Sequence, residues 1–166
     1  MGNPCNVILA LQGCFLEMSI EWNVAINTIK EMSNGLVVNE KRLKDIANEY
    51  KNQLRIKTPS NQQLVQNLSG GNQQKVVIAK TLAANSKVVI FDEPTRGIDV
   101  GAKREIYELM CELADRGIGI IMISSDMEEL LGMSQRIIVM AGGCISGEIM
   151  KSEFNQELVL KHASDF

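Results

Sequence analysis

The spacing of apolar residues changes along the chain, from a helical period in the first half to short apolar runs in the second. Two early stretches carry apolar residues three or four positions apart, which predicts two helices. These positions are Trp22, Ala25, Ile26 and Ile29 in the first stretch and Leu43, Ile46, Ala47 and Tyr50 in the second. Asn39 is the expected cap of the second helix, and Pro59 breaks the chain before a third helical run.

The second half alternates apolar runs with helical patterns, which predicts an α/β fold. Strands are predicted over residues 88–92, 118–124, 137–140 and 145–150, the last two as a hairpin around Gly142-Gly143. Helices are predicted over residues 100–116, 127–131 and 152–161.

Three large residues in the first half allow two interpretations. Met18, Trp22 and Met32 either form a partner-binding face or belong to an ordinary core. Helical spacing is more often typical of core residues, so we expect the core.

Composition narrows the classes of function. The formal net charge of −3 gives no electrostatic reason to expect a nucleic-acid partner. No run approaches the roughly 20 apolar residues of a membrane-spanning helix, and the apolar run at 7–11 lacks the basic residues that open a signal peptide. The four cysteines lack metal-ligand or disulfide spacing, so we expect reduced thiols, and His162 is expected to be a solvated helix residue.

Two carboxylates follow the first buried strand. The run at 88–91 is apolar, and Asp92 and Glu93 come where that strand ends. Ligands bind at this edge in open α/β sheets. An aspartate there can hold Mg²⁺, and an adjacent glutamate can orient and deprotonate an attacking water. Taken alone, the string equally suits two solvated acids.

A Ser-Gly-Gly turn opens the third helical run. Ser69 is the expected N-cap, and Gly70 and Gly71 let a ligand approach the backbone closely. Free N–H groups and the positive end of the helix dipole favour a phosphate there. A loop that enters a surface helix is the commoner meaning of such a turn, but the carboxylate strand and the Gly-Ile-Asp at 97–99 together indicate nucleotide chemistry.

The segment at 68–76, Leu-Ser-Gly-Gly-Asn-Gln-Gln-Lys-Val, resembles the signature motif of ABC transporter ATPases, and residues 88–103 resemble their Walker B segment and D-loop. The residues of these two segments are similar to those in the second nucleotide-binding domain of ATPases that power bacterial simple-sugar importers. The resemblance implies an α/β fold, namely a partial P-loop NTPase (RecA-like) core with an ABC helical subdomain. It divides the chain into an unmatched segment or tag (1–12), the helical subdomain with the signature motif (13–84) and the carboxy-terminal part of the ATPase core (85–166).

The resemblance also implies roles for individual residues. Those expected to close over the γ-phosphate of ATP on an opposing nucleotide-binding domain are Ser69, Gly70, Gly71 and Gln73. Those expected at the other composite site are Asp92 as Mg²⁺ ligand, Glu93 as general base and Ser125 at the catalytic switch position. Asp99 is expected at the interface between domains. Most of the family has histidine at the switch, so serine suggests a weakened site.

One expected motif is missing. No glycine in the 166 residues is followed by lysine, so the chain lacks the Gly-x-x-x-x-Gly-Lys-Ser/Thr loop (Walker A) that cradles phosphates. Losing three or four charge-assisted hydrogen bonds removes roughly 5–12 kcal/mol of gross interaction. We therefore expect a carboxy-terminal fragment of a longer ATPase that neither binds ATP tightly nor hydrolyses it alone.

For the intact parent, the resemblance implies hydrolysis of ATP with Mg²⁺ that drives uptake of a simple sugar. The implied partners are membrane subunits and a second nucleotide-binding domain, at the inner face of the cell membrane. The alternative is a non-catalytic module that docks on a partner without ATP turnover.

The missing motif leads to a prediction about the sheet. The strand that enters Walker A is expected between strands 88–92 and 118–124, so its absence leaves two unpaired edges. We predict that the apolar run at 7–11 fills the vacant place as a surrogate strand, or failing that, that the edges pair between chains in a dimer. A disordered tag is the alternative.

Overall fold

The computed structural model describes residues 5–9, 13–34 and 37–164 and divides into two compact units, residues 1–123 and residues 124–166. This division differs from the boundary near residue 84 that the resemblance implies. Helix α3 (Gly70–Ala83) ends at that boundary but contacts both a strand and a helix of the same compact unit, so the unit continues past it. The proposed subdomains, and the status of residues 1–12, stay predictions. Residues 1–4 and 10–12 lie outside the described part of the chain.

The first unit contains the helices that the apolar period predicts. They are α1 (Ile20–Ala25), which continues as the 3₁₀ helix η2 (Ile26–Met32), then α2 (Glu40–Gln53), the 3₁₀ turn η3 (Val65–Asn67), α3 and α4 (Val100–Asp115). A short antiparallel pair, β2 (Ser33–Asn34) with β3 (Val37–Val38), precedes α2. Asn39 caps α2 as predicted, since its side chain accepts a hydrogen bond from the Arg42 backbone N–H.

A small apolar core joins η2 to α1 and α2. Ala25, Met32 and Leu43 are buried in it, and Trp22 packs against it. The core interpretation is therefore confirmed for Met32 and Trp22, whereas Met18 is half-buried and stays open. The helix changes from α to 3₁₀ geometry at Ile26. Positions 26–29 hold two isoleucines, an asparagine and a threonine, which are all weak helix formers, and this favours the change.

Helix α3 is the central helix of the first unit. It contacts α1, α2, α4 and a strand, and its buried residues surround the helix rather than forming one stripe. Its buried positions are Gly71, Gln74, Lys75, Val76, Val77, Ile78, Ala79, Thr81, Leu82 and Ala83. The start of α3 is consequently held by neighbours on several sides.

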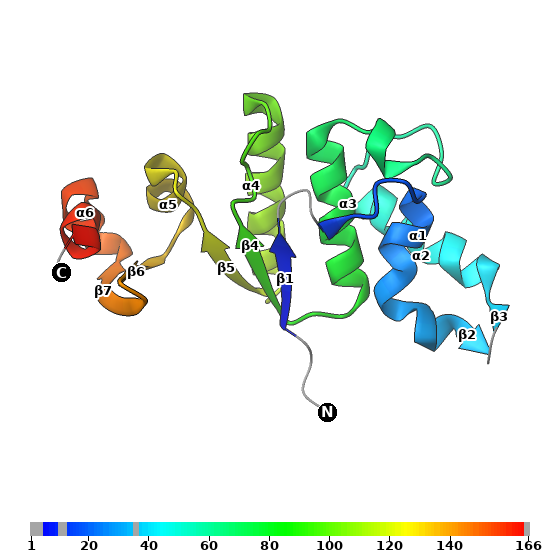
Figure 1. Cartoon of the computed structure of the whole chain (residues 1–166), viewed down its shortest axis with the longest axis horizontal. Coiled ribbons are helices and arrows are strands. Elements are labelled where there is room, and N and C mark those ends of the chain that lie inside the picture. Colours follow the sequence, from blue (N-terminus) through cyan, green and yellow to red (C-terminus); the bar gives the residue numbers. More distant parts are fainter. Residues whose placement is uncertain (1–4, 10–12, 35–36, 165–166) are drawn as a thin grey trace. The chain divides into compact units, whose positions relative to one another are not determined.

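Three parallel strands form the sheet of the first unit in the order β1-β4-β5 (Figure 1). They are β1 (Cys5–Leu9), β4 (Val88–Asp92) and β5 (Gly119–Ile123). Cys5 is opposite Val88 and Leu9 opposite Asp92, while on the other side Asp92 is opposite Ile123. The apolar N-terminal run therefore forms a strand, as predicted, although it spans 5–9 in the described residues.

The predicted location of that strand is wrong. Strands β4 and β5 pair directly, so no vacant place lies between them, and β1 occupies the opposite side of β4. The outer side of β5 is an edge within the described residues, and Ile121 and Ile123 are half-exposed there. Dimer formation through sheet edges stays a prediction.

The second unit consists of a hairpin and two helices. Its elements are α5 (Met127–Met133), β6 (Arg136–Ala141), β7 (Cys144–Met150), the 3₁₀ turn η4 (Lys151–Glu153) and α6 (Gln156–Ser164). The hairpin turns at the predicted glycines, both with positive φ. Its core is Ile137, Val139, Ile149 and Val159.

Two details of the second unit differ from the prediction. Helix α6 begins at Gln156, because a 3₁₀ turn occupies the start of the predicted 152–161 helix. His162 is half-buried rather than solvated, since its ring lies where a side chain at Gly147 would project. No helix among the described residues has the length and apolar character needed to cross a membrane.

Candidate functional site

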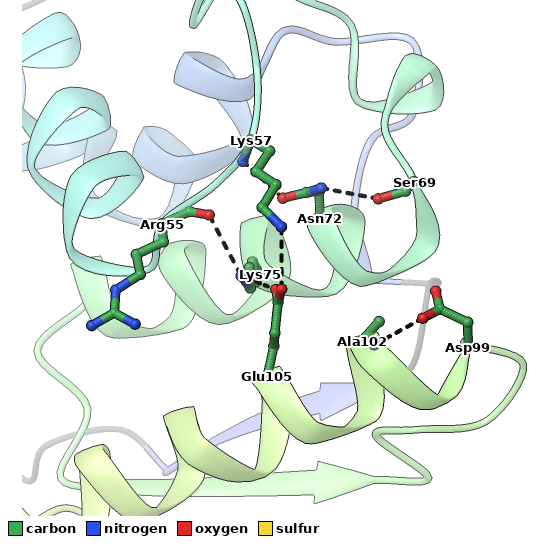
Figure 2. A network of polar contacts seen from close by, with 8 residues as sticks. All are labelled: Arg55, Lys57, Ser69, Asn72, Lys75, Asp99, Ala102 and Glu105. Atoms are coloured by element: carbon green, nitrogen blue, oxygen red, sulfur yellow. Dashed lines mark hydrogen bonds and ion pairs between the residues drawn. The ribbon is translucent and has the colours of Figure 1, made fainter.

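The start of α3 holds the predicted Ser-Gly-Gly turn. Ser69 is the N-cap, with extended backbone (φ −63°, ψ 154°), but its hydroxyl accepts no hydrogen bond from the helix backbone. The exposed hydroxyl oxygen instead accepts a hydrogen bond of 2.9 Å from the Asn72 side-chain nitrogen (Figure 2). The Asn72 oxygen accepts 2.8 Å from the backbone N–H of Lys57.

The two glycines bring the start of α3 against the start of α4. A Cβ added at Gly71 would lie 2.8 Å from the Cβ of Ala102, and one added at Gly70 would lie 3.4 Å from Ile98. A side chain at the buried Gly71 would therefore separate the two helices. Glycine is required here for close packing, a reason that the sequence prediction, which assigned both glycines to ligand approach, did not include.

Gln73 is used to hold the loop before α3. Its side-chain nitrogen donates to the backbone carbonyls of Val65 (3.2 Å) and Leu68 (3.1 Å). The backbone carbonyl of Gln73 accepts a hydrogen bond from the thiol of Cys14 at 3.8 Å, and burial raises the pKa of that thiol to about 11. The predicted contact of Gln73 with phosphate stays a prediction, and its observed contacts tie the signature loop to the body of the unit.

Asp99 caps the neighbouring helix. It precedes α4 with extended backbone (φ −71°, ψ 161°), and its Oδ1 accepts a hydrogen bond of 2.9 Å from the Ala102 backbone N–H. The carboxylate thus satisfies one of the free N–H groups at a helix start. The predicted role of Asp99 between domains stays untested by these contacts.

An ionic network that the sequence analysis did not single out joins α3 to α4. The Lys75 ammonium lies 2.6 Å from one Glu105 oxygen, and the Lys57 ammonium lies 3.2 Å from the other (Figure 2). The Lys75 side chain is only 6 % exposed, and it also donates to the Arg55 carbonyl at 3.5 Å. Hydrogen bonds from Lys75 and then Lys57 hold the pKa of Glu105 below its ordinary value. The distance in sequence between these residues explains why no local pattern indicated them.

A pocket of about 190 Å³ lies beside this network. Charged residues of both signs line it, together with Leu54 and Leu109. Its walls include Lys57, Lys75 and Glu105, so the same groups that brace the two helices also form this pocket.

The predicted carboxylates lie at the carboxyl end of β4. Asp92 is half-buried as the last residue of the strand. Glu93 has a positive φ of 47°, and its backbone N–H donates 2.8 Å to the carbonyl of Ile123 at the end of β5. A left-handed glutamate costs on the order of 1 kcal/mol, and such strain is common at functional positions.

The donor set suits a magnesium ion only in combination with a bound phosphate. No group of three or more His, Cys, Asp or Glu side chains gathers as a metal site among the described residues. Mg²⁺ commonly uses one or two protein carboxylates together with substrate phosphates, so Asp92 at an open strand end has suitable chemistry. The strand end does not provide a complete protein cage.

Ser125 belongs to the second unit, where it is exposed and follows β5 by two residues. Its neighbours form a tight turn before α5: the Ser124 hydroxyl donates to Glu129, and the Asp126 side chain accepts from the Glu128 and Glu129 backbone N–H groups. The structure therefore assigns the capping role to Asp126. The switch role of Ser125 stays a prediction.

Comparisons with known proteins give a consistent result. The sequence profile of the ABC transporter family matches residues 11–96. The chain is 50% identical over 153 residues to a ribose import ATP-binding protein of Oceanobacillus iheyensis, covering 92% of this chain and 31% of the relative. It is 47% identical over 154 residues to a putative ribose/galactose/methyl galactoside import ATP-binding protein of Halalkalibacterium halodurans. The chain spans about 30% of the length of these curated relatives.

Solved structures support the fold. A dimeric ATP-binding cassette in a post-hydrolysis state with ADP and Pi matches with a TM-score of 0.73 and 22% identity, over 92% of this chain and 65% of that one. A protein of Clostridium perfringens that is part of an ABC transporter complex matches with a TM-score of 0.73 and 20% identity, over 96% of this chain and 60% of that one. The predicted α/β cassette fold is confirmed.

Proposed function

Because the chain belongs to the ABC transporter family, we propose that the loop at the start of α3 contacts the phosphates of ATP held by another nucleotide-binding domain. The observation that carries this proposal is the exposed Ser69 hydroxyl at the N-terminus of a 14-residue helix, which accepts no hydrogen bond from a backbone N–H of that helix. A hydroxyl donor and the positive end of a helix both favour a phosphate. Gly70 adds no side chain next to Ser69, the buried Gly71 packs against Ala102, and the Gln73 side chain holds the loop before the helix.

A second site is proposed at the end of β4. Asp92 would hold Mg²⁺, and Glu93 would orient and deprotonate the attacking water. The metal, when bound, neutralises charge on the phosphates. The switch role of Ser125, which belongs to the second unit, and the place of Asp99 between two nucleotide-binding domains are proposed from the family resemblance alone. The left-handed backbone of Glu93 supports this assignment, because strain of that kind often accompanies function.

The names of the relatives support a proposed biological setting. Their names describe import ATP-binding proteins for ribose or for ribose and galactose, so we extend to this chain a role in ATP-driven uptake of a simple sugar. The chain would then act at the inner face of the cell membrane with membrane subunits as partners. Because it lacks a Gly-Lys pair, the phosphate-binding loop of each site it completes would come from elsewhere.

That sequence feature also favours a second candidate function. A chain without a Walker A loop could serve as a non-catalytic module that folds and docks on a partner. The two candidates differ in one measurable respect, which is whether nucleotide strengthens the docking.

The test is association with a P-loop-bearing nucleotide-binding domain of a ribose import ATP-binding protein. With ATP and Mg²⁺ and with hydrolysis blocked in that domain, the dissociation constant of the pair should fall at least about tenfold. Ser69→Ala should remove most of this gain, since it deletes one charge-assisted hydrogen bond. Ser60→Ala, at an exposed serine outside the loop, is the matched control and should leave the gain intact. Association that ignores nucleotide would favour the non-catalytic module.

The chain alone should bind ATP weakly and show no ATPase activity. Calorimetry with ATP and Mg²⁺ should give no dissociation constant near micromolar, because the phosphate cradle is missing from the sequence. Tight binding by the isolated chain would contradict the division of labour proposed above.

In a complete ATPase that carries this segment, Glu93→Gln should slow turnover at least about 100-fold and leave nucleotide binding largely intact. Glu112→Gln, at an exposed glutamate of α4, is the control. An equal loss of binding would assign Glu93 a structural role. Unchanged turnover would indicate that this site does not hydrolyse ATP, which would agree with a serine, Ser125, at the switch position.

A further inference from the structure

The Ser69 hydroxyl has a defined neighbour rather than free solvent on all sides. Five other side chains that precede helices in the described residues, those of Ser19, Asn39, Asp99, Asp126 and Asn155, accept hydrogen bonds from helix backbone N–H groups. Ser69 does not, and the group on its oxygen is the side-chain nitrogen of Asn72 at 2.9 Å. The oxygen therefore accepts from an amide that stands at the third position of its own helix.

The orientation of that amide follows from the partner on its other side. The backbone N–H of Lys57 lies 2.8 Å from Oδ1 of Asn72. A backbone N–H can only donate, so the atom facing it must be the amide oxygen. The amide nitrogen must then face Ser69, and the usual ambiguity between the two ends of an asparagine amide is removed.

Lys57 is itself held in place by the network between the helices. Its ammonium pairs with Glu105 on α4, which also pairs with the buried Lys75 of α3 (Figure 2). Lys75 in turn donates to the carbonyl of Arg55, two residues before Lys57. The segment that supplies the N–H to Asn72 is thus tied to both helices.

We propose that Asn72 is a positioning residue that holds the hydrogen of the Ser69 hydroxyl pointed towards bound phosphate; this rests on the function proposed above. The Asn72 nitrogen only donates, so it cannot accept the hydroxyl hydrogen. With one lone pair of Oγ occupied by that donor, the O–H bond points away from Asn72. The hydrogen is then left for an outside acceptor, and a phosphate oxygen is a strong one.

Asn72→Asp reverses this arrangement with almost no change in shape. One carboxylate oxygen keeps the hydrogen bond from Lys57, and the other accepts the hydrogen of Ser69, so the hydroxyl is turned away from the ligand. A carboxylate at the third helix position is favourable for folding, because it faces the positive end of the helix. A purely structural role of Asn72 therefore predicts retained or increased thermal stability together with unchanged nucleotide response.

The readout is the dissociation constant between the 166-residue chain and the P-loop-bearing domain loaded with ATP and Mg²⁺, with hydrolysis blocked. We expect Asn72→Asp to weaken the complex at least about tenfold with a melting temperature that is unchanged or raised. Asn72→Ala, which frees the hydroxyl to rotate, should weaken it only a few-fold. Asn39→Asp adds the same charge at the start of α2, keeps its cap and should change nothing.

A double-mutant cycle separates orientation from charge repulsion. In the Ser69→Ala background no hydroxyl hydrogen remains to be turned, so Asn72→Asp should weaken the complex less than about twofold further. The same tenfold loss in both backgrounds would show repulsion of phosphate and overturn the proposal. A response to Ser69→Ala without a response to Asn72→Asp would also overturn it and leave the proposed function standing. No response to Ser69→Ala would contradict the proposed function itself.

Discussion

The starts of α3 and α4 lie against each other but treat their free N–H groups differently. Both helices follow an N-cap with extended backbone, and both N-caps carry an oxygen that can accept a hydrogen bond. The Asp99 carboxylate accepts a hydrogen bond from the Ala102 backbone N–H, whereas the Ser69 hydroxyl accepts none from the backbone of its helix. Close packing at Gly71 brings the two starts together.

The difference shows that one N-cap side chain in this region stabilises the fold while the other is left available to a ligand. A side chain that satisfies its own helix is committed to stability and cannot offer the same atoms to a ligand. Ser69 accepts no hydrogen bond from a backbone N–H of its helix, so both its hydroxyl hydrogen and the helix N-terminus remain available to an anion. The start of α4 stabilises the unit, and the start of α3 is kept for the proposed phosphate contact.

The largest expected effect on stability comes from a substitution that pushes the N-termini of α3 and α4 apart. Gly71→Ala places a methyl group 2.8 Å from Ala102 Cβ, which has no rotatable bond to move it away. The free energy of unfolding should fall by about 1–3 kcal/mol. Gly70→Ala is the matched control: its new methyl would lie 3.4 Å from Cγ2 of Ile98, an ordinary contact, and alanine favours a helix over glycine. Urea denaturation should show a much smaller loss, or a gain, for Gly70→Ala, and equal losses would contradict the packing argument.

A smaller effect should follow from removing the caps one at a time. Asp99→Ala deletes an acceptor for the Ala102 N–H and should cost about 1 kcal/mol of stability. Ser69→Ala deletes a hydroxyl that caps nothing and should cost less than about 0.5 kcal/mol. Urea denaturation of both variants tests the comparison directly. A similar cost at the two positions would mean that Ser69 supports its helix after all.

The smallest effect should come from the charges that brace the two helices. The pKa of Glu105 is lowered from its ordinary value of 4.5 in the folded state by hydrogen bonds from Lys75 and Lys57. A depressed carboxyl pKa contributes stability that is present above the unfolded pKa and is lost as pH falls through the folded pKa. Wild type should therefore exceed Glu105→Gln in stability above pH 4.5, by a margin that shrinks below it. The margin should be modest, because the Glu105 side chain is 42 % exposed.

Measuring stability against pH for both proteins checks this, with Glu112→Gln as a control on the same helix face exposed to solvent. The Glu112 variant should show no comparable pH-dependent margin. A margin for Glu105 that stays constant from neutral to acidic pH would rule out its charge as the cause.

The strand at 5–9 shows how far the apolar pattern carries a prediction. A short apolar run followed by glycine predicts a strand, and one forms. Its neighbour in the sheet depends on contacts between residues more than 80 positions apart, and the predicted place between β4 and β5 was wrong. Local patterns carry no information about which side of a sheet a strand joins.

Local periodicity and turn chemistry determined most of the helices and strands, the cap at Asn39 and the glycine hairpin, because these depend on residues within a few positions of one another. Only the tertiary structure decided that the Ser69 hydroxyl does not cap its helix and that the Asn72 amide faces that hydroxyl. That arrangement requires the Lys57 N–H, which is 15 residues away from Asn72, and a brace through α4 that holds Lys57. The direction of a side-chain amide is set by the partners that surround it, and folding brings those partners together from distant parts of the chain.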